Sequence, residues 1–547
     1  MALDLSPEQK ELGKKNFQRT VSDLAARDAA LSRRDFMKGM LAGTGGAALT
    51  AAAYFGYKES AGAVTKNPVK AGLIGAGDEG GVLVGEHNPE FLQFVAYSDI
   101  RPYNQKRIFA GEPLPSPRRG FNHHYGKDAE KKIKFYEDYH QLLQNKDVEA
   151  VVIALPLHLH APVAIDCMKA GKHVLCEKLM AWNTAQCKEM IKVADEADRC
   201  LSIGHQRHYS LLYAHGVEVL RSGVLGDVKH IRALWHRNNS WPRVDPKKGT
   251  PLTDAKGHVL YRDGWYPDIR KDDRDALENR IKEFGYESME ELVRWRLYNR
   301  TGGGLMAELG SHQLDACSIF LGKVHPLAVS GIGTRSFYRD QYREGEREAD
   351  DHVFVTFEFP GPNYFRPGTR QVNDKDDVVV VTYSSINTNM FESYGECVMG
   401  THGTMIVEME QNIQLFMERD PNAKDSGAPR STSVTVATTG AGKPALDATS
   451  SQGGAMKAGS EEGPKSAGPI SRGYREEMEH FACCVRLWNE GSKADRQLPR
   501  CHGKVAMADA IIALTSNLAM KQRQRIEFKE EWFDASSPAV PVDSIKA

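Results

Sequence analysis

The chain has 547 residues, more than one compact core usually spans, so we expect at least two domains. Lysine and arginine total 71 and aspartate and glutamate total 72, and this balance gives no support to a nucleic-acid binder, whose basic excess would show in the total. Hydrophobic residues at 41% and charged residues at 26% exclude a disordered or polytopic membrane chain. Nine scattered cysteines without a CxxC pair do not match a disulfide scaffold or a zinc ribbon.

An uncharged, weakly apolar stretch lies near the amino terminus, at residues 39–57. A pair of arginines, Arg33 and Arg34, stands just before it, and a small-x-small sequence follows at 61–63. This order resembles a twin-arginine export signal. We therefore expect residues 1–63 to be a signal segment read by the twin-arginine export machinery, and the protein to be periplasmic or otherwise exported. The alternative is an ordinary membrane anchor that stays uncleaved.

A glycine-rich turn follows the first strand-like run of the chain. Residues 69–74 read as a short buried strand that leads into Gly75-x-Gly77-x-x-Gly80. In a dinucleotide-binding turn the first glycine allows the tight turn, the second lets the backbone approach the pyrophosphate, and the third allows close packing of helix on strand. The pyrophosphate would then sit at a helix N-terminus, where free N–H groups favour an anion.

An acidic residue closes the next strand-like run. Asp99 stands 19 residues after Gly80, where a carboxylate hydrogen-bonds the adenosine ribose hydroxyls of NAD and repels a 2′-phosphate. Arg101 is close enough to attract that phosphate, so NAD is the expected cofactor and NADP the alternative. Asp99 could instead be a helix N-cap or turn residue.

Further strand and helix patterns alternate along the first part of the chain. Residues 134–136, 148–155 and 173–176 read as strands, and 161–170 as a helix. This alternation predicts an α/β Rossmann domain over 64–205, a doubly wound parallel sheet that binds ligands at the carboxyl ends of its strands.

These motifs and later ones occur in the order of the Gfo/Idh/MocA family, the glucose–fructose oxidoreductase and inositol dehydrogenase family, which the chain resembles over residues 67–535. The matching segments are Gly75-x-Gly77-x-x-Gly80, Asp99, Pro156-x-x-x-His160, Glu177-Lys178, and residues 204–207, 222–226 and 302–315. The resemblance implies a cofactor site that includes Arg101, Pro156, His160 and Glu177, the last of these on the nicotinamide-side ribose. Two departures stand out, because Leu179 replaces the usual proline and Glu308 the usual aspartate.

The resemblance also implies the catalytic residues. Lys178 would hydrogen-bond the reacting hydroxyl of the substrate, and His312 would act as acid and base with Glu308 as its acidic partner. Glu308, His312 and Asp315 are spaced i, i+4 and i+7, so on an α-helix they would share one face. A nearby carboxylate favours the charged form of a histidine.

The pattern changes to half-buried strands after about residue 228. We expect residues 206–535 to form an α+β domain with an open, mainly antiparallel sheet that makes the substrate wall or an oligomer interface. Helices at 475–488 and 504–521 would return to the first domain. We interpret 241–300 as an aromatic and charged insertion, either a carbohydrate surface or simple packing, and 420–470 as a flexible loop without secondary structure; residues 536–547 form a tail.

Further polar residues are candidates for substrate binding. His236, Arg237 and Asn238 follow a predicted strand, and Asp315 is either a substrate-orienting or a structural residue. His158 and His160 lack a carboxylate at ligand spacing, so we expect no metal.

Together these observations predict an exported NAD(P)-dependent oxidoreductase that transfers hydride between nicotinamide and a hydroxyl of a sugar, cyclitol or glycoside. Because free NAD is scarce outside the cytoplasm, we expect the cofactor to be tightly bound, and the protein to be a homo-oligomer. One alternative is an NAD-dependent glycoside hydrolase that uses transient oxidation and elimination. Another is a sugar-binding relative that has lost its chemistry.

Overall fold

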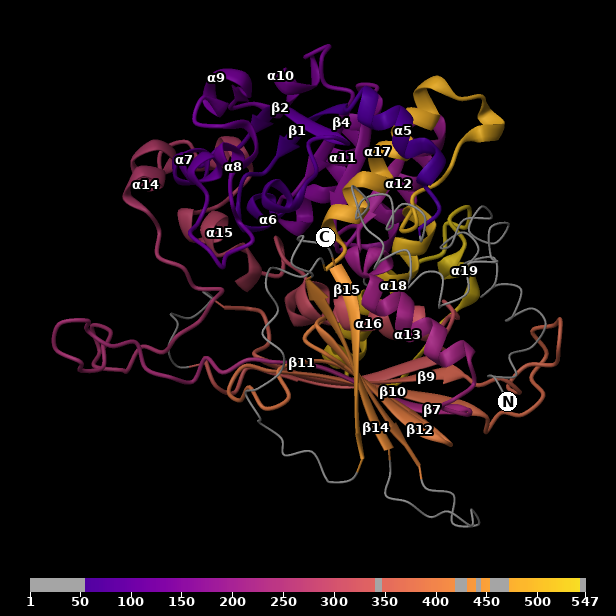
Figure 1. The fold of residues 1–547 in the computed structure, drawn as a ribbon. Helices are drawn as coiled ribbons and strands as arrows, with labels where there is room; N and C mark the ends of the chain where they lie inside the picture. The colour runs from indigo at the N-terminus through magenta and orange to yellow at the C-terminus, as the bar shows by residue number, and fades with distance from the viewer. Residues whose placement is uncertain (1–54, 340–346, 419–429, 439–443, 453–471, 542–547) are drawn as a thin grey trace.

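The computed structural model describes residues 55–339, 347–418, 430–438, 444–452 and 472–541. Two sheets form the body of the protein, and helices lie around the first sheet and between the two (Figure 1). The helices are α5 (Lys58–Lys66), α6 (Asp78–Glu86), α7 (Pro102–Ala110), α8 (Phe121–Tyr125), α9 (Ala129–Lys132), α10 (Tyr139–Leu143), α11 (His160–Lys169), α12 (Thr184–Glu196), α13 (Leu211–Arg221), α14 (Lys271–Leu277), α15 (Met289–Val293), α16 (Ser311–Phe320), α17 (Tyr474–Glu490), α18 (Gly503–Gln522) and α19 (Glu530–Phe533).

The first sheet has six parallel strands in the order β3-β2-β1-β4-β5-β6. This order reverses direction between β1 and β4, and such a switch point creates the crevice that binds dinucleotides in Rossmann folds. All four residues of β4 are buried, as expected for a strand covered by helices on both faces. The predicted α/β Rossmann domain is confirmed. Its strands are β1 (Val69–Ile74), β2 (Leu92–Ser98), β3 (Lys134–Tyr136), β4 (Ala150–Ile153), β5 (His173–Glu177) and β6 (Leu201–Gly204).

The second sheet has ten strands in the order β15-β14-β13-β12-β11-β7-β10-β9-β8-β16. Neighbours pair antiparallel except β7 and β10, which run parallel, so the predicted open and mainly antiparallel sheet is confirmed. The strands are β7 (Val228–His236), β8 (Ala328–Thr334), β9 (His352–Pro360), β10 (Val378–Ile386), β11 (Tyr394–Gly400), β12 (Gly403–Glu408), β13 (Asn412–Met417), β14 (Arg430–Thr438), β15 (Pro444–Gln452) and β16 (Ile526–Glu527).

The prediction that 420–470 lacks secondary structure is wrong, because β14 and β15 lie within it and extend the sheet beyond β13. Residues 431–438 are mostly serine, threonine and valine, and threonine and valine suit a pleated strand. The overall small-residue composition of the segment concealed this local pattern. The remaining residues of 420–470 lie outside the described ranges.

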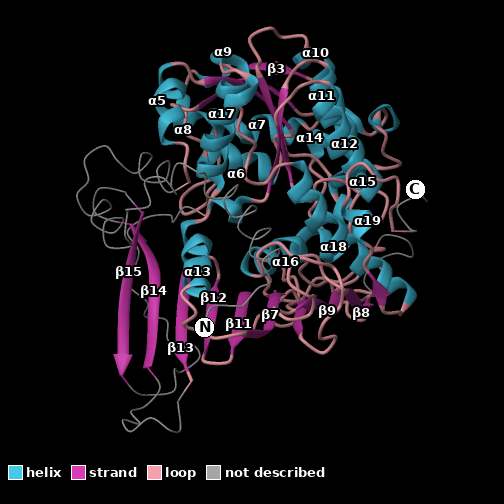
Figure 2. Ribbon diagram, turned by 90° about the vertical axis from the view of Figure 1, so that its right-hand side faces the viewer, coloured by secondary structure: helices cyan, strands magenta, loops and turns pink. Residues whose placement is uncertain are grey.

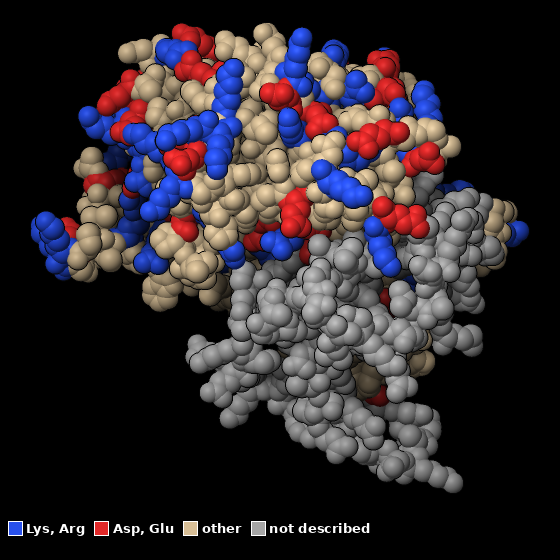
Figure 3. All heavy atoms as spheres, turned by 45° about the horizontal axis from the view of Figure 1, so that its top comes forward, with Lys and Arg blue, Asp and Glu red and all other residues tan. Residues whose placement is uncertain are grey.

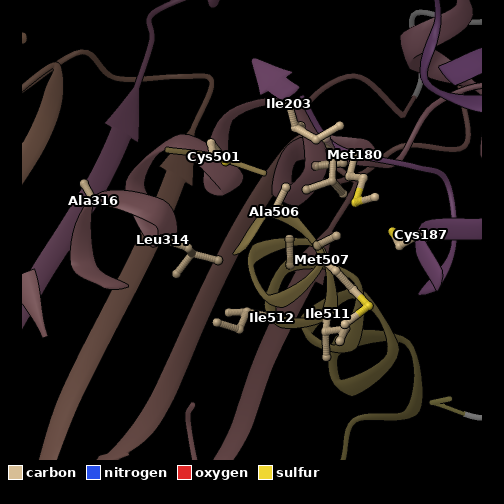
Figure 4. Packing of buried hydrophobic residues seen from close by; sticks show 14 of the residues in the cluster. Met180, Cys187, Ile203, Leu314, Ala316, Cys501, Ala506, Met507, Ile511 and Ile512 are labelled. Carbon is tan, nitrogen blue, oxygen red and sulfur yellow. The ribbon is translucent and has the colours of Figure 1, made fainter. Parts of the chain in front are cut away.

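Helices α16 and α18 lie between the two sheets, as Figure 2 shows. Met507, Ile511 and Ile512 of α18 pack in one core with Leu314 of α16 and Met180 of the first domain (Figure 4). Helix α17 instead joins the first domain and packs against α5, β1 and β2, as predicted for the first of the two final helices. Helix α18 differs from its prediction, since it packs on β8 as well as on α12 and so connects the domains.

The boundary expected after residue 63 does not coincide with an edge of the folded body. Phe55, Tyr57 and Ala61 are buried, and the hydroxyl of Tyr57 donates a hydrogen bond to Glu479 at 2.9 Å. A cut after residue 63 would divide α5, which spans Lys58–Lys66. The arginine pair and most of 39–57 lie outside the described residues. Within the described ranges, no helix is long and apolar enough to cross a membrane.

The 241–300 insertion packs partly against the Rossmann domain. It contains α14 and α15, and its apolar core contacts Ile100 and Leu159, which follow β2 and β4. Arg294 lies 3.5 Å from the ring centroid of Tyr266, so part of its aromatic content is used in internal packing. Acidic and basic side chains are interspersed over the described face of the Rossmann domain in Figure 3, as the near-neutral composition indicates.

Candidate active site

The glycine-rich turn between β1 and α6 has the geometry that the sequence predicts. Gly75 has a φ of +96°, and a Cβ there would lie 2.3 Å from the carbonyl oxygen of Ala154. A Cβ on Gly80 would lie 2.1 Å from the carbonyl oxygen of Gly75, so only glycine allows this contact of helix and turn. A Cβ on Gly77 would have one neighbour within 4 Å, the side-chain nitrogen of Asn104 at 3.8 Å. The turn therefore leaves room for a pyrophosphate at the N-terminus of α6, as the cofactor requires.

The carboxylate of Asp99 faces this turn from the end of β2. It accepts hydrogen bonds from the backbone N–H groups of Ala76 at 2.7 Å and Arg101 at 2.7 Å. Burial raises the pKa of Asp99, although these two hydrogen bonds oppose the shift. The prediction that places Asp99 at the ribose position fits this geometry.

Arg101 is held by the insertion. Its Nε and Nη2 atoms each lie 2.9 Å from Oδ2 of Asp273, whose side chain is 0% exposed. Asp273 also accepts a hydrogen bond from the backbone N–H of Tyr103 at 2.9 Å. The positive charge that could attract a 2′-phosphate is therefore neutralised by a residue that belongs to none of the sequence motifs.

Glu177 and Lys178 lie at the carboxyl end of β5, beside the switch point. The Oε2 atom of Glu177 accepts a hydrogen bond from the N–H of Lys178 at 3.1 Å, whereas Oε1 is buried without a partner among the described residues. Burial, reinforced by the charge of Glu79, raises the pKa of Glu177 well above its usual value. A Cβ on Gly204 would lie 2.8 Å from Oε1, so the glycine of that motif makes room for the glutamate. An unpartnered acceptor here fits a cofactor ribose hydroxyl.

Lys178 connects the Rossmann domain to the helix that carries His312. Its Nζ donates a hydrogen bond to the carbonyl oxygen of Glu308 at 3.0 Å, one turn before α16 begins. The ring of Trp235, at the end of β7, lies 5.6 Å from the ring of His312 between centroids. The lysine and the histidine thus lie at the junction of the two domains, with an aromatic side chain beside the histidine.

The predicted partnership of Glu308 with His312 is not what the structure shows. Residues Met306–Gly310 form a π-helical turn before α16, so the i, i+4, i+7 spacing does not give Glu308, His312 and Asp315 the common face of a regular α-helix. The Oε2 atom of Glu308 instead accepts a hydrogen bond from Nε of Arg296 at 2.6 Å. Although burial opposes ionisation, the charges of Arg296 and Lys178 lower the pKa of Glu308.

The electrostatic environment of His312 is also opposite to the expected one. Burial, together with the charges of Lys178 and Arg207, lowers the pKa of His312 well below its usual value. A neighbouring carboxylate was expected to favour the charged ring, but cations dominate its surroundings. The environment therefore favours the neutral ring of His312 over the protonated ring.

His160 supports the site from behind. Its ring nitrogens lie 2.8 Å from the carbonyl oxygens of Leu179 and Leu155, the residues that follow Lys178 and β4. The ring is buried and both nitrogens face protein, so His160 joins two loops at the sheet edge rather than contacting a cofactor. Pro156, by contrast, stays partly exposed at that edge. The peptide between Lys178 and Leu179 is cis.

Asp315 belongs to a buried polar network behind the site. Its Oδ1 accepts hydrogen bonds from Nε2 of His208 at 2.8 Å and Nζ of Lys323 at 2.6 Å. Two groups within this network have potential metal-ligand atoms within 4.8 Å of one another; they are His205–Cys501–Asp509 and His208–Asp315–Asp509. The ammonium of Lys323 bonds both Asp315 and Asp509, however, and so supplies the positive charge there. Of the two roles considered for Asp315, substrate orientation and structural support, these contacts fit the structural one.

The three candidates after β7 differ in their position. His236 is bonded to the carbonyl oxygen of Phe391 and the hydroxyl of Ser384, and Asn238 accepts hydrogen bonds from Ser240. These two side chains therefore hold the sheet edge. Arg237 follows the end of β7, and its guanidinium carbon lies 5.5 Å from the ring centroid of Trp265.

Comparison with known proteins decides the family. The model of the Gfo/Idh/MocA oxidoreductase family with an NAD-binding Rossmann fold matches residues 69–205, and the model of its C-terminal alpha/beta domain matches 280–495. The chain belongs to this oxidoreductase family. The gap between the two models contains β7 and most of the 241–300 insertion.

Individual relatives match shorter parts of the chain. An inositol 2-dehydrogenase of Salmonella paratyphi B is 37% identical over 94 residues, which are 17% of this chain and 28% of that protein. A 2,7-anhydro-N-acetylneuraminate hydratase of Escherichia coli is 25% identical over 220 residues, 40% of this chain and 45% of that protein. The chain thus spans less than half the length of these curated relatives. A levoglucosan dehydrogenase, solved with NADH and levoglucosan, shares the fold with a TM-score of 0.51 and 16% identity over 84% of this chain and 99% of that one.

Three residues of the site could not be found from the sequence. Asp273 and Arg296 lie in the insertion, and Trp235 lies inside a strand that reads as ordinary sheet. The insertion's mixed charge and aromatic content was a signal for its importance, but nothing in the sequence showed which residue meets which partner.

Proposed function

We propose that this chain is an NAD-dependent oxidoreductase that acts on a hydroxyl of a sugar, cyclitol or glycoside. The observation that carries the proposal is the meeting of Lys178, at the edge of the Rossmann sheet, with the segment that leads into His312. The neighbouring Glu177 offers an unpartnered buried oxygen to the cofactor, and the ring of Trp235 offers an apolar face to a sugar ring.

Each residue has a distinct task in this proposal. NAD, when bound, accepts hydride from the substrate carbon. The ammonium of Lys178 is fixed by the carbonyl of Glu308 and has further N–H groups with which to bind the reacting hydroxyl. The ring of His312 is the proposed acceptor of the proton of that hydroxyl, since burial and neighbouring cations favour its neutral form, in which one ring nitrogen is free to accept.

The cofactor is NAD rather than NADP in this proposal, and it is retained between turnovers. Asp99 lies at the ribose position, and Asp273 neutralises Arg101 beside it. The apolar core of the insertion contacts Ile100 and Leu159 at the same edge, so the insertion packs beside the proposed adenosine position. This packing supports tight binding.

The test is to purify the protein, denature it and identify the released nucleotide. NAD(H) is expected at close to one molecule per chain. A Lys178→Ala variant should keep the nucleotide and lose turnover, and unchanged turnover would remove the catalytic assignment and leave a sugar-binding protein as the better description. Absence of any dinucleotide, with no binding of added NAD or NADP, would refute the proposal.

A redox-neutral reaction is the second candidate, favoured by the hydratase among the relatives. In that reaction transient oxidation acidifies the adjacent C–H bond, a substituent is eliminated, and the hydride returns. Turnover in D₂O distinguishes the two candidates. Deuterium at the carbon next to the oxidised position and an unchanged cofactor would indicate elimination, whereas a ketone or lactone product with reduced cofactor would indicate net oxidation.

Export through the twin-arginine route is part of the proposed function and rests on the sequence around Arg33 and Arg34. Changing both to lysine should abolish export in a fractionation experiment, and unaltered export would refute the route. Homo-oligomer formation is proposed through the outer face of the second sheet, where Ile332 and Phe354 pair across two strands at 48% and 47% exposure. Light scattering of the purified protein measures it.

A further inference from the structure

Among the described residues, the guanidinium of Arg237 has no hydrogen-bond partner, and it interacts electrostatically with Arg296, the partner of Glu308. The backbone N–H of Arg237 is bonded to the carbonyl of Ile386, which fixes its place after β7. Its Nε is buried without an acceptor, and no hydrogen bond or ion pair joins its guanidinium to the described residues. The guanidinium carbon lies 5.5 Å from the ring centroid of Trp265, so the insertion supplies a flat surface on one side. Arg237 as a whole is partly exposed, but leaving its buried Nε–H unpaired costs free energy, and an anion would supply the missing acceptor.

The groups that face Arg237 do not supply this anion. Asp263 is the nearest carboxylate in electrostatic terms, but its Oδ2 accepts a hydrogen bond from Nη1 of Arg347 at 2.7 Å and both side chains are buried. Arg296 adds a second positive charge, and Tyr383 and Tyr338 contribute hydroxyl groups. Burial and the charge of Arg296 lower the pKa of Arg237, although Asp263 opposes this.

Cationic side chains contribute to the field at the reaction centre, together with the carboxylates of Glu177 and Glu308. Lys178, Arg237 and Arg296 are cations, and of these only Arg296 forms an ion pair, with Glu308. Burial lowers the pKa of His312, and the charges of Lys178 and Arg207 lower it further. A neutral sugar would leave the positive charge of Arg237 without a partner, whereas a substrate with one negative charge would form an ion pair with it.

We propose that Arg237 binds a carboxylate of the substrate, so that the substrate is a sugar acid, oriented with its reacting hydroxyl at Lys178. The guanidinium fork matches the two oxygens of a carboxylate. A single uncompensated arginine suits a monoanion, because Arg296, the second guanidinium, is already engaged by Glu308. The inference rests on the proposed function and names the class of its substrate.

The test compares matched acidic and neutral ligands on the holoenzyme. Binding of glucuronate and galacturonate is measured against glucose and galactose by calorimetry, at low and high salt. The acids are expected to bind roughly ten- to hundredfold more tightly, as a charge-assisted hydrogen bond provides, and the advantage should shrink with salt. Arg237→Met should remove the advantage and Arg237→Lys should retain part of it. Arg294→Met, which removes another ring-stacked arginine of the insertion, is the control and should leave the advantage intact.

Several outcomes would overturn the inference. Equal affinity for acids and neutral sugars would do so, as would an Arg237→Met variant that weakens both classes equally. If a phosphorylated sugar bound more tightly than either acid, the ligand of Arg237 would be a phosphate dianion and not a carboxylate. The proposed function is refuted by a different result, the absence of bound dinucleotide. If neutral sugars alone led to NADH formation, the proposed function would hold and the inference of a sugar-acid substrate would be refuted.

Discussion

Replacing Asp273 by asparagine tests how the insertion controls cofactor choice. In the native protein both Nε and Nη2 of Arg101 contact Oδ2 of Asp273, with exposures of 20% for the arginine and 0% for the aspartate side chain. The variant removes the negative charge and keeps the shape. The charge of Arg101, which Asp273 neutralises in the native protein, then becomes available to a 2′-phosphate.

The magnitude follows from the bond that Arg101 would gain. A charge-assisted hydrogen bond contributes about 1.5–3 kcal/mol, which corresponds to a roughly ten- to hundredfold gain in affinity for NADPH. Asp99 still repels the phosphate, so the expected gain is near the lower end of that range. Loss of the pair also weakens docking of the insertion by about 2 kcal/mol, less than for a fully buried pair because Arg101 is partly exposed.

The assay is fluorescence titration of nucleotide-free protein with NADH and NADPH, with the melting temperature measured in parallel. Asp272→Asn is the matched control, because Asp272 is the next residue and pairs with Lys106 at exposures of 55% and 73%. The control should change neither the nucleotide preference nor the melting temperature measurably. If Asp273→Asn left the ratio of the two affinities unchanged while the protein stayed folded, the view that Asp273 sets the cofactor preference would be refuted.

Three further predictions concern catalysis, cofactor binding and stability. His312→Asn should lower kcat by roughly 10²- to 10⁴-fold. Because the pKa of His312 is lower in the folded protein than in the unfolded chain, activity and stability should hold at neutral pH and fall as acid protonates the ring. A pH–rate profile that dropped on the alkaline side near pH 7 would contradict this. Gly204→Ala should weaken NADH binding at least tenfold by displacing Glu177, since the added Cβ would lie 2.8 Å from Oε1 of that residue. An unchanged affinity in calorimetry would show that Glu177 does not hold the cofactor. Tyr57→Ala should cost about 3 kcal/mol in denaturant unfolding, because the side chain is 0% exposed, whereas Leu114→Ala, at 76% exposure, should cost little; equal effects would place residue 57 outside the folded body.

Local patterns were sufficient to predict the cofactor domain. A run of buried residues followed by glycines at fixed spacing forms a strand and turn through short-range sterics, which is why Gly75 and Gly80 have the expected roles. Lys178 and Glu177 were predictable for a related reason, since residues that end neighbouring parallel strands meet at one edge of the sheet.

Residue partners across the domain junction could not be predicted in this way. The spacing of Glu308 and His312 indicates a shared face only if the helix is regular, and the π-helical turn breaks that condition. Likewise, the strand propensity of β14 was hidden by a composition typical of loops, and became evident only from its pairing with β13.

The sequence by itself indicated the family and the Rossmann turn, which the comparisons and the structure confirm, and it predicted the roles of Lys178 and His312, because each depends on local spacing or on motif order. Only the tertiary structure decided that Asp273 neutralises Arg101, that Glu308 pairs with Arg296, and that the buried Nε of Arg237 has no acceptor among the described residues. Charges act through space, and their partners here come from an insertion whose docking no short-range rule specifies. The cofactor preference and the substrate class that we propose therefore depend on the insertion more than on the shared motifs.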